Sequence, residues 1–184
     1  DHPDARPDLG GADLSGADLS QANLAKANLN NANLSGARLA LADLFETSLV
    51  GAEFSGTDLT GARLFQASMY GADFSNADLT DVDLRDTNMR EVYLNSADLT
   101  GADFSGAKLV QVDFENAKCW HTIFAGVDLS TSTGLETIRH AAVSSVGIDT
   151  LYLSHGKIPA AFLRGCGVPQ AFIDALPEMS KQLS

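Results

Sequence analysis

The chain has little of what small proteins commonly use to crosslink themselves or to do chemistry. Among 184 residues there are two cysteines, one tryptophan and four histidines. Cys119 and Cys166 are too few to build a disulfide framework. Positive charge is also scarce, with 12 Lys and Arg against 24 Asp and Glu, which argues against a nucleic-acid-binding surface or a polybasic membrane patch. No apolar run approaches the length of a membrane-spanning helix.

Residues that usually carry catalysis or bind metals do not gather at a recognisable spacing. The four histidines are scattered and match no zinc site: His2, His121, His140 and His155. Cys119 precedes His121 by two residues, but the repeat directs the cysteine inward and the histidine to a corner, which argues against a Cys–His nucleophile. We therefore predict no enzyme activity, no catalytic residue, no metal site and no cofactor. Weak calcium binding by columns of Asp is the less favoured alternative to a solvated acidic surface.

The sequence instead contains an uninterrupted five-residue repeat. An apolar residue stands at every fifth position from Leu9 to Leu129, which gives 25 consecutive centres. A small residue, most often Ala, stands two positions before each centre, and Asp or Asn usually lies between them. The remaining two positions are often pairs that form turns, such as Ser-Gly and Thr-Gly.

A period of five fits neither an ordinary helix nor a flat strand. At about 100° per residue, successive centres of a helix would lie about 140° apart and would form no stripe. In a flat strand, an odd step would place successive centres on opposite faces. Each repeat must therefore contain a short extended step, with the small residue and the centre pointing inward, followed by a corner. Repetition of this unit predicts a solenoid with a leucine-filled axis.

The segments GADLS, QANLA, KANLN, NANLS and GADFS resemble the A(D/N)LxX motif of pentapeptide repeat proteins. This resemblance covers about 120 of the 184 residues. It implies an all-β solenoid: a right-handed quadrilateral parallel β-helix with four repeats per coil, and hence about six coils. We expect a loose N-terminal lead-in over residues 1–8, the β-helix over 9–130, and a small α-helical C-terminal cap or linker region over 131–184.

Negative charge is concentrated in the repeats. Residues 9–129 contain 17 Asp and Glu and 7 Lys and Arg, a net charge of −10, whereas residues 130–184 hold four of each. Most of these acids stand immediately before a centre, where they should face water. The repeats therefore predict a rod with an acidic surface.

A few large side chains replace the usual Ser, Thr or Asn just after a centre. With four repeats per coil they fall into two columns on adjoining corners, and they form our candidate interaction patch: Phe45, Val50, Phe65, Tyr70, Arg85 and Arg90. Outward apolar patches often mark a surface for a protein partner. The alternative is that these side chains only cover neighbouring backbone, because single apolar residues are common on protein surfaces.

Helix signals replace the repeat after Leu129. Trp120 and Ile123 already disturb the outward positions, which predicts that a later segment covers the last coil there. Three short helices are expected to dock on the open end of the solenoid as a cap. Their predicted limits are Ser144 or Ser145 to Leu151, Pro159 to Gly165, and Pro169 to Pro177.

The complete repeat without a convergent site predicts a non-catalytic scaffold or protein–protein interaction module whose partner is unknown. The family resemblance implies an alternative, an acidic DNA mimic that binds a type II topoisomerase such as gyrase as an end-to-end homodimer. The tail, GIDTLYLSHGKIPAAFLRGCGVPQAFI, resembles the region that joins pentapeptide repeats to a Toll/interleukin-receptor-like domain in some bacterial proteins. It implies the N-terminal region of a larger signalling protein. We expect a bacterial, cytoplasmic monomer or end-to-end homodimer without direct nucleic-acid or membrane binding; a removed N-terminal leader is the alternative.

Overall fold

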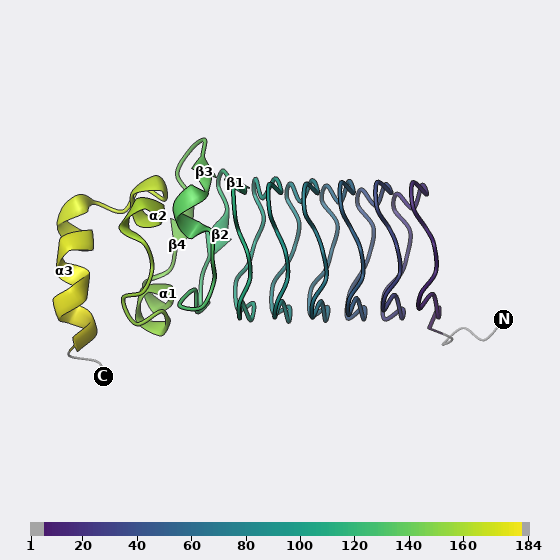
Figure 1. Ribbon diagram of the computed structural model, residues 1–184, viewed down its shortest axis with the longest axis horizontal. Coiled ribbons are helices and arrows are strands. Elements are labelled where there is room, and N and C mark those ends of the chain that lie inside the picture. Colours follow the sequence, from purple (N-terminus) through teal and green to yellow (C-terminus); the bar gives the residue numbers. More distant parts are fainter. Residues whose placement is uncertain (1–5, 182–184) are drawn as a thin grey trace.

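The computed structural model describes residues 6–181, which form an elongated rod (Figure 1). Coils of nearly constant size follow one another along most of the rod, and three helices lie at its C-terminal end. Parallel bridges join residues 20 positions apart, beginning with Asp8 and Asn28 and continuing to Asp103 and Ile123. Four five-residue repeats therefore make one coil, as the resemblance implied. The predicted lead-in and His2 lie largely outside the described residues.

Each side of a coil is a very short extended step. The outward residue before a centre forms the bridge: the Asn33 N–H donates to the Ala12 carbonyl at 2.9 Å, and the Leu34 N–H donates to the Glu53 carbonyl at 2.7 Å. The centre and the small residue point to the axis, where Leu59 and Ala62 are both 0% exposed. The predicted inward direction of these two positions is confirmed.

The two residues after each centre form a turn, as predicted. The N–H of the next small residue closes the turn on the carbonyl of the centre, as in Ala17 and Leu14 at 3.0 Å. The second turn residue has a left-handed φ, 65° at Gly16, which explains the frequent Gly and Asn at this position. The outward Asp also supports the turn, because the Asp13 carboxylate accepts the Ser15 N–H at 3.1 Å.

The axis is filled by equivalent side chains from successive coils. The Phe54 and Phe74 rings stack with centroids 4.6 Å apart. Thr57 takes the place of a small residue and remains satisfied, since its hydroxyl donates to the Leu34 carbonyl at 2.8 Å. Full burial of a Leu or Phe side chain stabilises a fold by about 1.5–3 kcal/mol. These stacked columns are therefore the main source of the rod's stability.

Parallel pairing continues beyond the last repeat, although the spacing lengthens. Strand β1 (Lys118–Cys119) pairs with β3 (Arg139–His140), and β2 (Ile123–Phe124) pairs with β4 (Ser145–Val146). The 3₁₀ helix η1 (Leu135–Thr137) lies between the two strands of the first pair in sequence. Paired residues are therefore 21 or 22 positions apart here instead of 20, and the backbone still pairs with the preceding coil.

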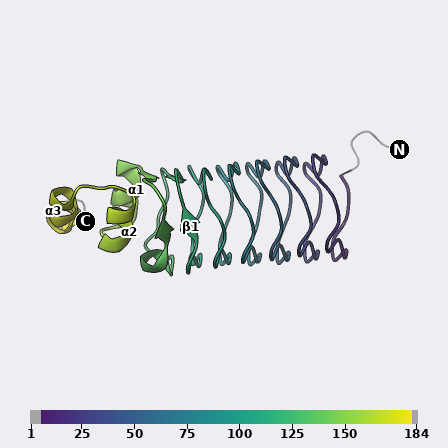
Figure 2. The ribbon, with the colours of Figure 1, turned by 90° about the horizontal axis from the view of Figure 1, so that it is seen from above.

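Three helices follow: α1 (Ile148–Leu153), α2 (Ala160–Gly165) and α3 (Gln170–Lys181). The α2 prediction is confirmed, since the helix begins after Pro159 and ends at Gly165. The predicted serine cap of α1 is wrong: Ser145 lies in β4, and Gly147 precedes the helix without a side-chain cap. Figure 2 shows that α3 is the element farthest from the coils.

The predicted end of α3 at Pro177 is also wrong, because the helix runs through this proline to Lys181. A proline inside a helix removes one backbone hydrogen bond and crowds the preceding turn. Here Ile173 is buried, and Leu176 is partly buried and packs against the hydrophobic core, whereas Pro177 is exposed. We infer that packing on this side keeps the helix continuous.

The predicted cover over Trp120 is wrong as well, because its side chain is 41% exposed. Ile123 is half-buried, and its backbone pairs with Ser145 in β4. The two residues therefore behave differently although both depart from the repeat. Within residues 6–181, no helix has the length and apolar character needed to cross a membrane.

Candidate interaction surface

The two outward phenylalanines stack on one corner of the rod. The rings of Phe45 and Phe65 have centroids 5.9 Å apart and an interplanar angle of 11°. A cation lies over each ring: Lys26 Nζ is 5.5 Å from the Phe45 centroid, and Arg85 Cζ is 5.5 Å from the Phe65 centroid. Such contacts contribute about 0.5–1 kcal/mol at exposed sites. We call these four side chains the aromatic column.

Both cations of the aromatic column also contact an acid. Arg85 donates two hydrogen bonds to the Asp83 carboxylate, each 2.8 Å long. This contact lowers the pKa of Asp83 and raises the pKa of Arg85. Lys26 Nζ lies 3.4 Å from a carboxylate oxygen of Glu46. The column therefore presents apolar rings between charges that are already compensated.

The next corner carries the second group of predicted residues. The Tyr70 hydroxyl donates to the Glu91 carboxylate at 3.0 Å, and this hydrogen bond raises the pKa of Tyr70. Arg90 Nε lies 3.3 Å from the same carboxylate. Tyr70 is 42% exposed and Val50 is half-buried. Glu91 thus fixes Tyr70 and Arg90 in one orientation.

Between these corners lies a face without formal charge, which we call the neutral face. Successive parallel bridges join its outward residues, and these are Asn28, Ser48, Ser68 and Asn88. The opposite face of the coil, two repeats farther along the chain, is charged at every corresponding position: Arg38, Asp58, Asp78 and Asp98. The neutral face is therefore a local exception on repeats whose net charge is −10.

The sequence prediction was incomplete at this surface. The structure joins Phe45, Phe65 and Arg85 by direct ring contacts, and it joins Tyr70 and Arg90 through Glu91. The prediction did not include Lys26, which contacts the Phe45 ring, or Glu91, which contacts Tyr70 and Arg90. It also did not include the neutral face between the two corners. Comparing every twentieth residue would have revealed the neutral face, because residues at that interval stand next to one another on the rod.

The two cysteines are buried and suit packing better than nucleophilic chemistry. Burial raises the pKa of Cys119 and of Cys166 to about 12, and a protonated thiol is a poor nucleophile. His121 is exposed at a corner, where its Nε2 accepts a hydrogen bond from the Trp120 indole at 3.2 Å. In the described part of the chain, no three His, Cys, Asp or Glu side chains form a group that could hold a metal ion.

The chain is similar to several solved proteins, and the fold agrees with that of HetL. HetL, a pentapeptide repeat protein involved in heterocyst differentiation regulation in the cyanobacterium Nostoc, is 27% identical with a TM-score of 0.58; the match covers 79% of this chain and 76% of HetL. A pentapeptide repeat protein of the Arabidopsis thaliana thylakoid lumen is 29% identical over 61% of this chain and 68% of its own, with a TM-score of 0.35. QnrB1, a plasmid-mediated fluoroquinolone resistance protein, is 22% identical over 79% of this chain and 82% of its own, with a TM-score of 0.28. No curated protein is detectably similar.

The repeats themselves match a known family. Residues 8–40, 42–81 and 77–116 match the family described as pentapeptide repeats, in 8 copies. Together these segments make up more than half of the 184 residues. Proteins of this kind fold as right-handed quadrilateral β-helices, which agrees with the four-sided coil described above. The chain belongs to the pentapeptide repeat family.

Proposed function

We propose that this protein is a non-catalytic interaction module that binds a protein partner through the neutral face and its two flanking corners. One observation carries the proposal. On a chain with a net charge of −12, the outward positions from Asn28 to Asn88 are uncharged and lie between corners with Phe45, Phe65 and Tyr70. The centres of protein interfaces are likewise depleted of charged residues and enriched in aromatic residues.

The aromatic side chains are already ordered before any partner binds. Phe45 and Phe65 are stacked, and Tyr70 is hydrogen-bonded to Glu91. Immobilising a flexible side chain at an interface costs about 0.5–1.5 kcal/mol, so side chains that are already held lose less on binding. Arg85 and Arg90 would lie at the rim, where their existing partners Asp83 and Glu91 limit their contribution.

We also propose that residues 131–184 cap the C-terminal end of the solenoid. The Thr150 hydroxyl in α1 accepts the Val127 N–H at 3.2 Å and donates to the Phe124 carbonyl at 3.0 Å. Ser154, one turn later, accepts the Leu129 N–H at 3.0 Å through its hydroxyl. Satisfying the backbone groups of this edge opposes pairing with another chain. A covered end leaves the side of the rod as the surface for a partner.

The DNA-mimic alternative has weaker support. The charge of −10 on the repeats favours it, since a mimic of DNA must present rows of negative charge. Several rows are interrupted by cations paired with the acid one coil earlier: Arg38 with Asp18, Arg63 with Asp43, and Lys118 with Asp98. Inhibition of gyrase supercoiling by the purified protein would support this alternative over the neutral face.

Site-specific photo-crosslinking tests the main proposal. A photoreactive phenylalanine analogue is placed at Ser68 on the neutral face and, as the matched control, at Asp78 on the opposite face. We expect a crosslinked protein partner from Ser68 only, identified by mass spectrometry in the source cells. The Phe45→Ser and Phe65→Ser double variant should lose this crosslink, whereas Tyr93→Ser, which changes a 51% exposed aromatic on another face, should keep it. Equal crosslinking from both faces would contradict the proposal.

A further inference from the structure

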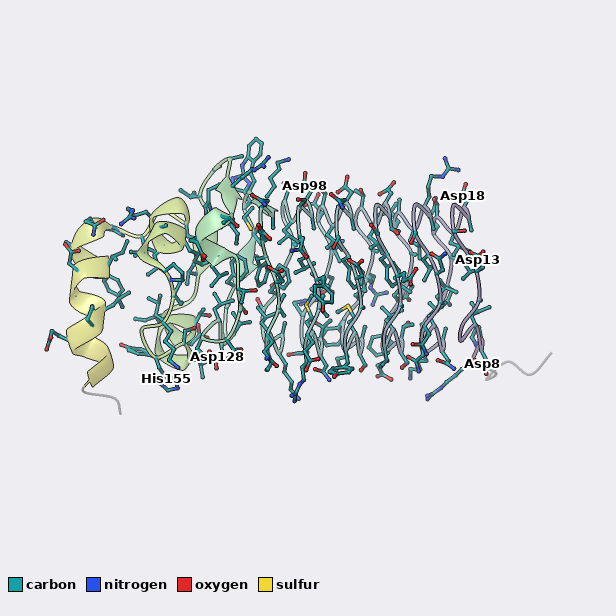
Figure 3. The ribbon with its side chains drawn as sticks, in the orientation of Figure 1. Asp8, Asp13, Asp18, Asp98, Asp128 and His155 are labelled. Atoms are coloured by element: carbon teal, nitrogen blue, oxygen red, sulfur yellow. The ribbon has the colours of Figure 1, made fainter. Side chains whose placement is uncertain are left out.

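A second polar site lies where the repeats meet the tail. A cavity of about 340 Å³ is lined by Ser96, Asp98, Asn116, Lys118, Arg139, His140 and Ala141. Asp98 and Lys118 are successive outward residues of one face, and β3 continues that column, since Lys118 pairs with Arg139. Figure 3 shows Asp98 on the same edge of the rod as Asp18, close to the start of the tail.

Several hydrogen-bonding groups around this cavity have no partner in the protein. Within residues 6–181, the side chains of Ser96, Asn116 and Arg139 make no hydrogen bond or ion pair. Both ring nitrogens of His140 are buried and also lack a partner there. Lys118 differs, because its Nζ donates to the Asp98 carboxylate at 2.7 Å. The cavity thus gathers donors that no other protein group occupies, including the exposed guanidinium group of Arg139, beside the buried ring of His140.

The charges at this site leave an excess of one positive charge. The charges of Lys118 and Asp98 compensate each other. Burial raises the pKa of Asp98, but hydrogen bonds from Lys118 and Thr100 lower it by more, so the Asp98 carboxylate is ionised. Burial lowers the pKa of His140, which is therefore neutral near pH 7. Arg139 supplies the remaining charge. A singly charged anion would balance it, whereas a doubly charged anion would leave excess negative charge beside Asp98.

We propose that this cavity binds a carboxylate group, on a small organic acid or at the C terminus of a peptide. The planar guanidinium of Arg139 matches the two oxygens of a carboxylate, and such paired hydrogen bonds are among the strong ones in proteins. The Asn116 amide and the Ser96 hydroxyl supply further donors from the neighbouring corners. The equivalent cation five coils earlier does not offer this, because Arg38 is already paired with Asp18.

The test is a titration of the whole chain with sodium propionate at constant ionic strength and near neutral pH, followed by proton–nitrogen correlation spectra. We expect saturable shifts in amides at Ser96, Asn116 and Ala141. Arg139→Gln should weaken binding by about tenfold or more, because charge-assisted hydrogen bonds are lost. Arg38→Gln, which removes the same charge from the same column, should leave the affinity unchanged.

Two further arms distinguish the source of the carboxylate and guard against misfolding. A short peptide that binds more tightly than propionate, and not at all as its C-terminal amide, identifies a peptide terminus as the ligand; otherwise a small acid is the ligand. Asn116→Ala should also weaken propionate binding, which provides a second variant if Arg139→Gln does not fold. Shifts that never saturate, equal binding by both arginine variants, or tighter binding of inorganic phosphate would overturn the proposal.

Discussion

Thr150 provides the sharpest test of how the end of the solenoid is closed. Its side chain is 0% exposed, and its hydroxyl serves both the Val127 N–H and the Phe124 carbonyl. Thr150→Val keeps the shape of the side chain and removes both hydrogen bonds. The buried Val127 N–H is left unsatisfied, whereas the Phe124 carbonyl still accepts the Gly147 N–H at 2.8 Å. An unsatisfied buried backbone group costs about 1–3 kcal/mol, and we expect a destabilisation of this size.

Thr137→Val is the matched control. The Thr137 hydroxyl also accepts a backbone N–H, from Asn116 at 2.8 Å, and donates to a backbone carbonyl, of Gly134 at 2.7 Å. Thr137 is exposed, so water can replace both bonds, and we expect a loss below about 1 kcal/mol. The two variants therefore make the same chemical change to the same type of hydrogen-bonding group and differ in burial.

Urea unfolding followed by circular dichroism measures the loss of unfolding free energy in each variant. An unchanged dependence of this free energy on urea concentration shows that the folded and unfolded states are comparable between the variants. Hydrogen exchange at the Val127 amide gives a local readout, which should lose protection in Thr150→Val and keep it in Thr137→Val. Equal losses of stability in the two variants, or a protected Val127 amide in Thr150→Val, would refute the role given to this hydroxyl.

Two other predictions concern the axis and the pH dependence. Leu59→Asp places an unpaired carboxylate at a 0% exposed position, so it should greatly lower the melting temperature; a melting temperature equal to that of the natural chain would contradict the inward assignment. Burial lowers the pKa of His140, so below its ordinary pKa of about 6.5 the unfolded chain takes up a proton that the folded chain does not. Stability should therefore fall between about pH 7 and pH 5, and His140→Leu should reduce this slope in urea unfolding at the two pH values. An identical slope would show that another group causes it.

The sequence predicted the structure of the repeats correctly because equivalent positions have equivalent backbone neighbours in every coil. A period of five is compatible only with a corner in each repeat, and this decided that Leu59 and Ala62 would face the axis. The bridges at 20-residue intervals then place Phe45 beside Phe65. Sequence reasoning reached these positions because the backbone is regular and contacts follow directly from spacing.

The limits of the helices in the tail were harder to predict from the sequence, because contacts in the tail do not repeat. Pro159 and Gly165 act locally on the backbone, and they correctly predicted the limits of α2. Pro177 also acts locally, but α3 continues through it, and we infer that the packing of Ile173 and Leu176 against the hydrophobic core is the reason. A propensity of a single residue was thus outweighed by burial that involves distant parts of the tail.

The sequence by itself determined the repeat and its inward and outward positions, because a fixed period leaves each of these little freedom. Only the tertiary structure decided which side chains form particular contacts outside the repeat pattern. Glu91 accepts a hydrogen bond from Tyr70, Thr150 forms hydrogen bonds with the backbone of Phe124 and Val127, and Arg139 lies beside a cavity without an ion-pair partner among residues 6–181. Each of these depends on contacts between segments about one coil apart or more, and side-chain contacts at that range are set by the packed backbone rather than by local pattern.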